Sequence, residues 1–193
     1  MSDWANSCIH RYHLASSAIS KWSVPGKPWG LSVTPKCSLL VTCHGGPKKL
    51  VEFSANSGQC VREIALPSDI VSPWHGVQLT TGQFVVCHGW DNSDRHRVCV
   101  VGDDGKVTRS YGGQRGSNVG QLDRPRHLAV DKDSQFIFVT DWFNDRVVLL
   151  SPTLEFVRYV SEELSGPWGL YLHQATRRLF VGQVGGGVTV IQL

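Results

Sequence analysis

Pro28-Trp29-Gly30-Leu31 is the first of four related tetrapeptides in this chain of 193 residues. Its counterparts are Pro73-Trp74-His75-Gly76, Pro125-Arg126-His127-Leu128 and Pro167-Trp168-Gly169-Leu170. The four prolines lie 45, 52 and 42 residues apart. A repeat of roughly 40–50 residues is typical of β-propellers and solenoids, in which each repeat forms one supersecondary unit. The spacing therefore says more about architecture than about function.

Each of these prolines begins the same succession of short apolar runs. In the third repeat the runs cover residues 128–130, 136–139, 147–150 and 156–160. Runs rich in β-branched and aromatic residues, separated by Gly, Asn, Asp and Pro, predict strands. Four antiparallel strands make one propeller blade, and no useful helical period is present. We therefore expect an all-β chain, a β-propeller of four-stranded antiparallel blades.

The two ends of the chain hold incomplete repeats. Residues 8–14 and 19–24 predict a third and a fourth strand, and the last repeat stops after its third strand. The single domain 1–193 then divides into a partial blade at 1–27, blades at about 28–72, 73–124 and 125–166, and a partial blade at 167–193. These amount to about four blades.

The sequence is compatible with two arrangements of these blades. In a small closed ring, residues 21–24 would pair with residues 188–191 and complete the last blade. In an open arc of a larger propeller that ladder is absent. We favour the open arc, whose unpaired strand edges would allow self-association.

Composition indicates a globular chain whose charge gives no signal for a membrane or nucleic-acid partner. Hydrophobic residues make up 41% of the sequence and the net charge is only +3. The start lacks a secretory signal, and no run of 18 apolar residues occurs, so we expect a cytoplasmic location. The six cysteines are then expected as buried thiols rather than disulfides.

The third repeat resembles an NHL repeat. The residues that carry the resemblance are Gly120-Gln121-Leu122-Asp123-Arg124-Pro125, Phe138-Val139-Thr140-Asp141 and Asn144-Asp145-Arg146. The close match covers about residues 112–150. The resemblance implies a propeller, usually of six blades, of the kind found at the C-terminus of tripartite-motif proteins behind RING, B-box and coiled-coil segments. None of those segments precedes the repeats here, so the resemblance carries over no ubiquitin-ligase activity.

The polar residues of that repeat have a structural interpretation. Asp141, Asn144 and Arg146 flank the turn between the second and third strands, where Asp and Asn can bond the turn backbone and Arg can pair with a carboxylate. Trp29, Trp74 and Trp168 recur with the blades. We favour rings wedged between blades near the mouth; the alternative is a partly exposed aromatic ring around a binding face.

Catalytic and metal-binding patterns are weak. The glycine-rich segment 112–120 lacks the ending of a phosphate loop, and no Gly-x-Ser-x-Gly elbow occurs. On one strand Cys8 and His10 share a face while His13 points away, a spacing that fits no zinc signature. We predict no enzyme, cofactor or metal. A propeller lactonase or lyase is the enzymatic alternative, and it would need a central cage of metal ligands.

Two sets of loops should meet on one face of the propeller: those before each first strand and those between each second and third strand. They would gather Trp29, Trp74, His75, Trp90, Arg95, Arg126, His127, Trp142, Phe143 and Trp168. Aromatic and arginine side chains together are typical interface anchors, so the face predicts a protein partner. Single-stranded RNA is the alternative, because the same side chains can stack on bases.

Overall fold

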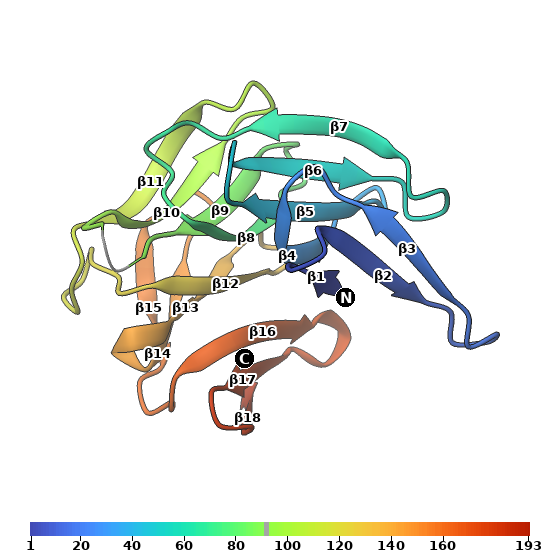
Figure 1. The fold of residues 1–193 in the computed structure, drawn as a ribbon. Helices are drawn as coiled ribbons and strands as arrows, with labels where there is room; N and C mark the ends of the chain where they lie inside the picture. The colour runs from blue at the N-terminus through green and yellow to red at the C-terminus, as the bar shows by residue number, and fades with distance from the viewer. Residues whose placement is uncertain (91–92) are drawn as a thin grey trace.

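The computed structural model describes residues 1–90 and 93–193, and within them the chain forms five antiparallel sheets in series (Figure 1). The helical content of these residues is two single turns of 3-10 helix, η1 (Trp142–Asn144) and η2 (Gln174–Thr176). None of the described helices is long and apolar enough to cross a membrane. The expected all-β propeller architecture is confirmed.

Three of the sheets have four strands each, and every strand pairs with its neighbours in the sequence. They contain β4 (Lys27–Val33), β5 (Leu39–His44), β6 (Lys49–Phe53) and β7 (Cys60–Ala65); β8 (Pro73–Gln78), β9 (Phe84–His88), β10 (His96–Val101) and β11 (Val107–Gly113); and β12 (Pro125–Val130), β13 (Ile137–Asp141), β14 (Arg146–Leu150) and β15 (Phe156–Ser161). Pairing within each repeat is the pattern predicted for blades.

Two flanking sheets have three strands each. The first holds β1 (Ser2–Asp3), β2 (Cys8–Tyr12) and β3 (Ile19–Ser23); the last holds β16 (Pro167–His173), β17 (Arg178–Gln183) and β18 (Val188–Gln192). The turn from Asp3 to Cys8 resembles the turn from Asp141 to Arg146. The last residue of each turn, Ser7 or Asp145, has a φ of 51°. β1 is therefore a short second strand, which adds to the predicted third and fourth.

The first strand of each blade lies beside the first strand of the next, so β4, β8, β12 and β16 pack in series. Among the described strands, β3 pairs only with β2 and β18 only with β17. The ladder between residues 21–24 and 188–191 is thus absent, as the open arc requires. The N-terminal and C-terminal sheets stand as separate ends of the series in Figure 1.

The core lies between blades rather than inside one of them. Along β9, Phe84 and Val86 pack in a cluster with Leu40 and Leu50 of the preceding blade. The alternate residues Val85 and Cys87 instead join the cluster of the following blade. Because side chains alternate across a strand, both faces of a middle blade are buried, which explains its unbroken apolar run. The outer strand β11 keeps an exposed face.

All six cysteines are free thiols; Cys37 and Cys60 are exposed, and the other four are buried.

Candidate binding site

Each repeated tetrapeptide forms a β-bulge at the start of the first strand of a blade. The register shifts immediately after Pro28, Pro73, Pro125 and Pro167. A bulge inserts an unpaired residue and turns its side chain away from the ladder. The residues after the prolines are Trp29, Trp74, Arg126 and Trp168. Three blades thus place a tryptophan in this slot, and one places an arginine there.

Six of the seven tryptophans in the sequence form one connected cluster, which we call the tryptophan mouth. Its members are Trp4, Trp29, Trp74, Trp90, Trp142 and Trp168. Ring centroids of Trp29 and Trp74 are 4.5 Å apart, and those of Trp142 and Trp168 are 5.0 Å apart. Every sheet contributes at least one ring, so the two sets of loops do meet on one face.

Arg126 lies at the centre of the tryptophan mouth. Its guanidinium carbon is 3.4 Å from the ring centroid of Trp74, 4.2 Å from that of Trp142 and 4.5 Å from that of Trp168. The residue is only 4% exposed, and burial lowers the pKa of Arg126 to about 9. The group therefore stays charged at neutral pH, with aromatic faces as its surroundings.

The tryptophan mouth has a buried floor and an exposed rim. Trp74 is 6% exposed, and its indole nitrogen donates to the Gly89 carbonyl. Trp4, Phe143 and Trp168 are 44%, 47% and 41% exposed. Phe143 packs edge-on against Trp142, and its ring centroid lies 3.7 Å from the Arg124 guanidinium carbon. A buried centre with a solvent-exposed rim is the anatomy of a recognition surface.

Two pockets open at the tryptophan mouth and share Trp29, Trp74, Arg126 and Trp168 in their walls. The first has a volume of about 430 Å³ and is completed by Met1, Ser2, Gly30, Leu31 and His127. The second has a volume of about 400 Å³ and is completed by Trp4, His44, Ser72, Trp90 and Trp142. Neither lining contains an Asp or Glu. The central carboxylate cage that a metal-dependent propeller enzyme would need is not among these lining residues.

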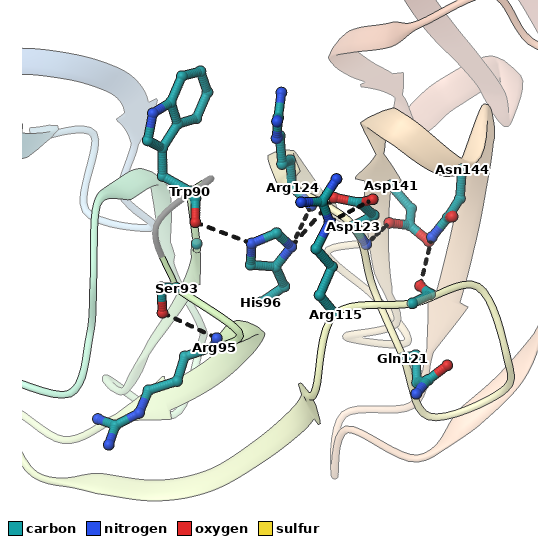
Figure 2. A network of polar contacts seen from close by, with 12 residues as sticks. Trp90, Ser93, Arg95, His96, Arg115, Gln121, Asp123, Arg124, Asp141 and Asn144 are labelled. Atoms are coloured by element: carbon teal, nitrogen blue, oxygen red, sulfur yellow. Dashed lines mark hydrogen bonds and ion pairs between the residues drawn. The ribbon is translucent and has the colours of Figure 1, made fainter.

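A polar network behind the tryptophan mouth holds two of its loops together (Figure 2). Nε2 of His96 bonds the Trp90 carbonyl at 3.2 Å, and its Nδ1 accepts the backbone N–H of Arg124 at 2.9 Å. Asp141 accepts the backbone N–H of the neighbouring Asp123 at 2.6 Å. The loop that carries Trp90 is thus joined to the segment that enters β12 and, through Asp141, to the turn that carries Trp142.

Asp141, Asn144 and Arg146 lie together in this network. Asp141 is fully buried and accepts from the Asn144 amide and from Nε of Arg146, both at 2.8 Å. Arg146 also donates to the carbonyls of Ser117 and Gln121. Burial raises the pKa of Asp141 to about 6, against the effect of its donors. The geometry matches a structural role, since it fixes residues 117–121 against the blade.

His75 does not face solvent, contrary to its expected place on the loop face. It is buried against His127, with ring centroids 3.8 Å apart. Its Nδ1 accepts the backbone N–H of Leu128, so Nε2 carries the proton and donates to the Leu31 carbonyl at 3.1 Å. His75 therefore links three consecutive blades. Its position on the first strand, next to the packed strands of its neighbours, explains the burial.

His127 lies at the inner edge of the expected face, and Arg95 lies outside it. Nδ1 of His127 accepts the backbone N–H of Leu170 at 3.4 Å, so this ring joins two blades, although its edge lines the first pocket. Arg95 is exposed, and its side chain extends away from the Trp90 ring (Figure 2). The structure thus gathers eight of the ten expected residues around the mouth and leaves His75 and Arg95 outside its surface.

Sequence reasoning missed Trp4 and Arg124 as members of this region. Trp4 follows Asp3 as Trp142 follows Asp141, and both turns have Asn two residues later. That shared Asp-Trp-x-Asn pattern was the signal that could have found it. Arg124 precedes Pro125, and its place beside Phe143 depends on the tertiary fold.

One compact group of metal-ligating side chains occurs in the described residues, formed by Asp3, Cys8 and His10. Cys8 and His10 share a strand face, as expected, with Sγ and Nε2 3.4 Å apart. Nε2 of His10 is also 3.2 Å from a carboxylate oxygen of Asp3. His13 is not part of the group.

The sequence matches no family model and no curated protein sequence. Solved structures are similar in fold at low identity. Virginiamycin B lyase from Staphylococcus aureus superposes with a TM-score of 0.63 at 11% identity over 98% of this chain and 64% of the lyase chain. A protein of unknown function from Bacteroides caccae gives 0.75 at 15% identity, over 97% of this chain and 72% of that one.

A chain of a nidogen/laminin complex gives a TM-score of 0.74 at 17% identity, over 97% of this chain and 71% of that one. The present chain thus spans 64% of the length of the lyase it matches. Likeness at these identities shows the β-propeller fold alone, and that fold occurs here both in a lyase and in a protein–protein complex.

Proposed function

We propose that this chain is a non-catalytic interaction module that binds a protein partner through the tryptophan mouth. The observation that carries the proposal is the convergence of six tryptophans, from all five sheets, on one face. Aromatic side chains provide large contact areas at a low cost in conformational entropy. Packing of the hydrophobic core alone does not require six tryptophans on one solvent-facing surface.

The exposed rim favours the same function. Trp4, Phe143 and Trp168 are each more than 40% exposed, although burial of large aromatic rings is favourable. Contiguous exposed aromatic surface marks interaction sites. The solved nidogen/laminin complex contains a chain of this fold, and the resemblance of residues 112–150 to NHL repeats points to the same class of module.

Single-stranded RNA is the second candidate, because Arg124 and the exposed rings could stack on bases. The net charge of +3 gives little general attraction to phosphate. The salt dependence of the binding affinity distinguishes an RNA partner from a protein partner. Affinity for RNA should fall steeply between low and physiological ionic strength as counterions are released, whereas an aromatic protein contact should change little.

Removing rim aromatics is expected to weaken capture of the partner without unfolding the chain. Phe143→Ala and Trp168→Ala should each lower affinity at least tenfold, on the order of the loss seen at interface hot spots, because both rings are exposed. The measurement is recovery of cross-linked partners on the immobilised chain, followed by titration of the partner identified. Melting temperatures are recorded in parallel.

Tyr171→Ala is the matched control, since Tyr171 is 61% exposed and lies outside both pockets. It should leave capture unchanged. Equal capture by wild type, Phe143→Ala and Trp168→Ala would remove the tryptophan mouth as the binding face.

A further inference from the structure

We propose that the Arg126 guanidinium is the docking point for a carboxylate of the bound partner. This inference rests on the proposed function and names the chemistry that the tryptophan mouth recognises. The carboxylate is either the C-terminus of a peptide segment or an Asp or Glu side chain within one. Apolar groups next to it would lie against the surrounding indole rings.

The Arg126 guanidinium has no hydrogen-bond acceptor within the described part of the chain. Nε, Nη1 and Nη2 of Arg126 are all buried, and none has a partner among the described residues. Aromatic faces stabilise the positive charge, but they offer no oxygen to its directed N–H donors. An unsatisfied buried charged donor is costly, so an arrangement of this kind calls for an acceptor from outside the chain.

The two buried arginines of this blade differ in this respect. Arg146 pairs with Asp141 at 2.8 Å and donates to two carbonyls. Arg126 has no carboxylate counterpart among the described ion pairs, and the linings of both pockets that it touches contain no acidic residue. Among residues 1–90 and 93–193, one guanidinium thus has an internal partner and the other has none.

The pockets give the ligand its place. Arg126 lies in the wall that the two pockets share, and each pocket, at about 430 and about 400 Å³, has room for a side chain and its backbone. A guanidinium binds a carboxylate through two parallel N–H···O bonds. Because the rings cover Arg126, one ring must move to admit it. Trp168 is the most exposed of the four rings around the guanidinium.

Small probes test the recognition directly. Binding of 3-phenylpropionate and of its neutral isostere 3-phenylpropionamide is followed through tryptophan fluorescence and indole N–H shifts in NMR. The wild-type chain should bind the carboxylate at least tenfold more tightly than the amide. Arg126→Gln should bind the two compounds equally, and Arg126→Lys should keep part of the preference because it keeps the charge without the fork. Arg95→Gln is the exposed control and should behave as wild type.

Peptides then identify the source of the carboxylate. Gly-Gly-Leu-Phe with a free or an amidated C-terminus tests a terminal carboxylate. Acetyl-Leu-Glu-Phe-amide against its Gln counterpart tests a side chain. A preference for the acidic member of either pair supports the proposal.

Three outcomes would overturn the carboxylate site: equal binding of acid and amide by wild type, an acid preference that survives in Arg126→Gln, or displacement of phenylpropionate by octauridylate, which would assign the guanidinium to phosphate. Arg126→Met, which keeps side-chain bulk without the charge, serves as a second variant if Arg126→Gln fails to fold. If Phe143→Ala loses partner capture and Arg126→Gln does not, the proposed function is supported and the carboxylate site is wrong. If both variants capture the partner as wild type does, the proposed function and the carboxylate site are both wrong.

A separate observation points to a second site. We infer that Asp3, Cys8 and His10 bind a divalent transition metal such as Zn²⁺. Their ligand atoms all lie within 4.8 Å of one another. Nε2 of His10 lies 3.2 Å from Asp3 Oδ2 and 3.4 Å from Cys8 Sγ. These separations are close to the edges of a tetrahedron around zinc, about 3.3–3.8 Å for bonds of about 2.0–2.3 Å.

Comparison of equivalent turns supports this second site. Asp3 and Asn6 repeat the positions and the side-chain bond of Asp141 and Asn144. Where the third complete blade places Arg146 to balance its aspartate, the first sheet places Cys8. A cation held by the thiolate, the imidazole and the carboxylate would supply the positive charge that Arg146 supplies in the third complete blade. Those three donor types together are typical of zinc.

Titration with Co²⁺ tests the metal site, because a tetrahedral thiolate complex has an intense visible spectrum and a charge-transfer band in the near ultraviolet. We expect one Co²⁺ per chain, displaced by Zn²⁺. Cys8→Ser and His10→Asn should each weaken binding at least tenfold, as loss of a ligand does. Cys37→Ser and His13→Asn are the matched controls and should not. Absence of the charge-transfer band, or its persistence in Cys8→Ser, would reduce the group to a hydrogen-bonded triad.

Discussion

Asp141→Ala is expected to lower the free energy of unfolding by about 3–5 kcal/mol, the cost of leaving one partner of a buried ion pair without the other. Asp141 is fully buried, and Arg146 is only 7% exposed. Removal of the carboxylate leaves the Arg146 guanidinium without its charge partner and removes the acceptor for the backbone N–H of Asp123. Urea unfolding followed by tryptophan fluorescence measures the change.

Asp104→Ala is the matched control for this variant. Asp104 also pairs with a cation, Lys106, but both side chains are more than half exposed, so the loss should stay within about 0.5 kcal/mol. A loss below about 1 kcal/mol in Asp141→Ala would mean that Arg146 finds another acceptor. The network would then not be what fixes residues 117–121.

The repeat made the fold predictable because it acts at two levels. Alternating apolar runs define the strands, and the proline tetrapeptides mark where each blade begins. The bulge after each proline was not visible in the sequence, yet it turns Trp29, Trp74 and Trp168 toward the tryptophan mouth. β1 was missed because two residues carry no periodicity; only the turn after Asp3 identifies it.

The site was less predictable because its features depend on side chains from all five sheets. The sequence grouped Arg126 with the tryptophans. It did not show that Arg126 is buried without an acceptor, since this depends on which acidic residues other blades bring near. His75 looked like a loop residue, but it lies where three first strands pack together. The direction of Arg95 is set by its loop, for which no pattern exists.

Mild acid is expected to destabilise the chain strongly, because two buried histidines, His75 and His88, and the half-buried His127 are held in the neutral form. His88 is fully buried, and its Nδ1 accepts the backbone N–H of Val71. Burial lowers the pKa of His75 from 6.5 to about 4 and that of His88 from 6.5 to about 3. Burial also holds the pKa of His127 well below its usual value.

These lowered pKa values make the folded chain less stable in acid. Below pH 6.5 these histidines are protonated in the unfolded chain but stay neutral in the folded chain. Their contribution to stability is therefore fully present above that pH and is lost as the pH falls toward the folded-state pKa values. Each such histidine contributes a loss of about 1.4 kcal/mol per pH unit. For His75 and His88 together the loss reaches about 5 kcal/mol at about pH 4.5, and His127 adds to it.

Asp141 has the opposite effect on stability. Its pKa is about 6 in the folded state, so as the pH falls this carboxyl is protonated in the folded chain before it is protonated in the unfolded chain, which favours folding. Its contribution of about 2 kcal/mol down to about pH 4.5 offsets less than half of the histidine loss. The remainder is a large part of the 5–15 kcal/mol that typically stabilises a domain. The urea midpoint should therefore be unchanged above about pH 7 and fall steeply between about pH 6 and 4.5.

Variants assign the titration to particular rings. His75→Gln should flatten the decline by about one proton, because the glutamine amide can bond the backbone without taking up charge. A midpoint that stays constant from about pH 7.5 to 5 would show that His75, His88 and His127 take up protons within the fold. The bonds that these rings make, including the one from His75 to the Leu31 carbonyl, would then have to exist in a second arrangement.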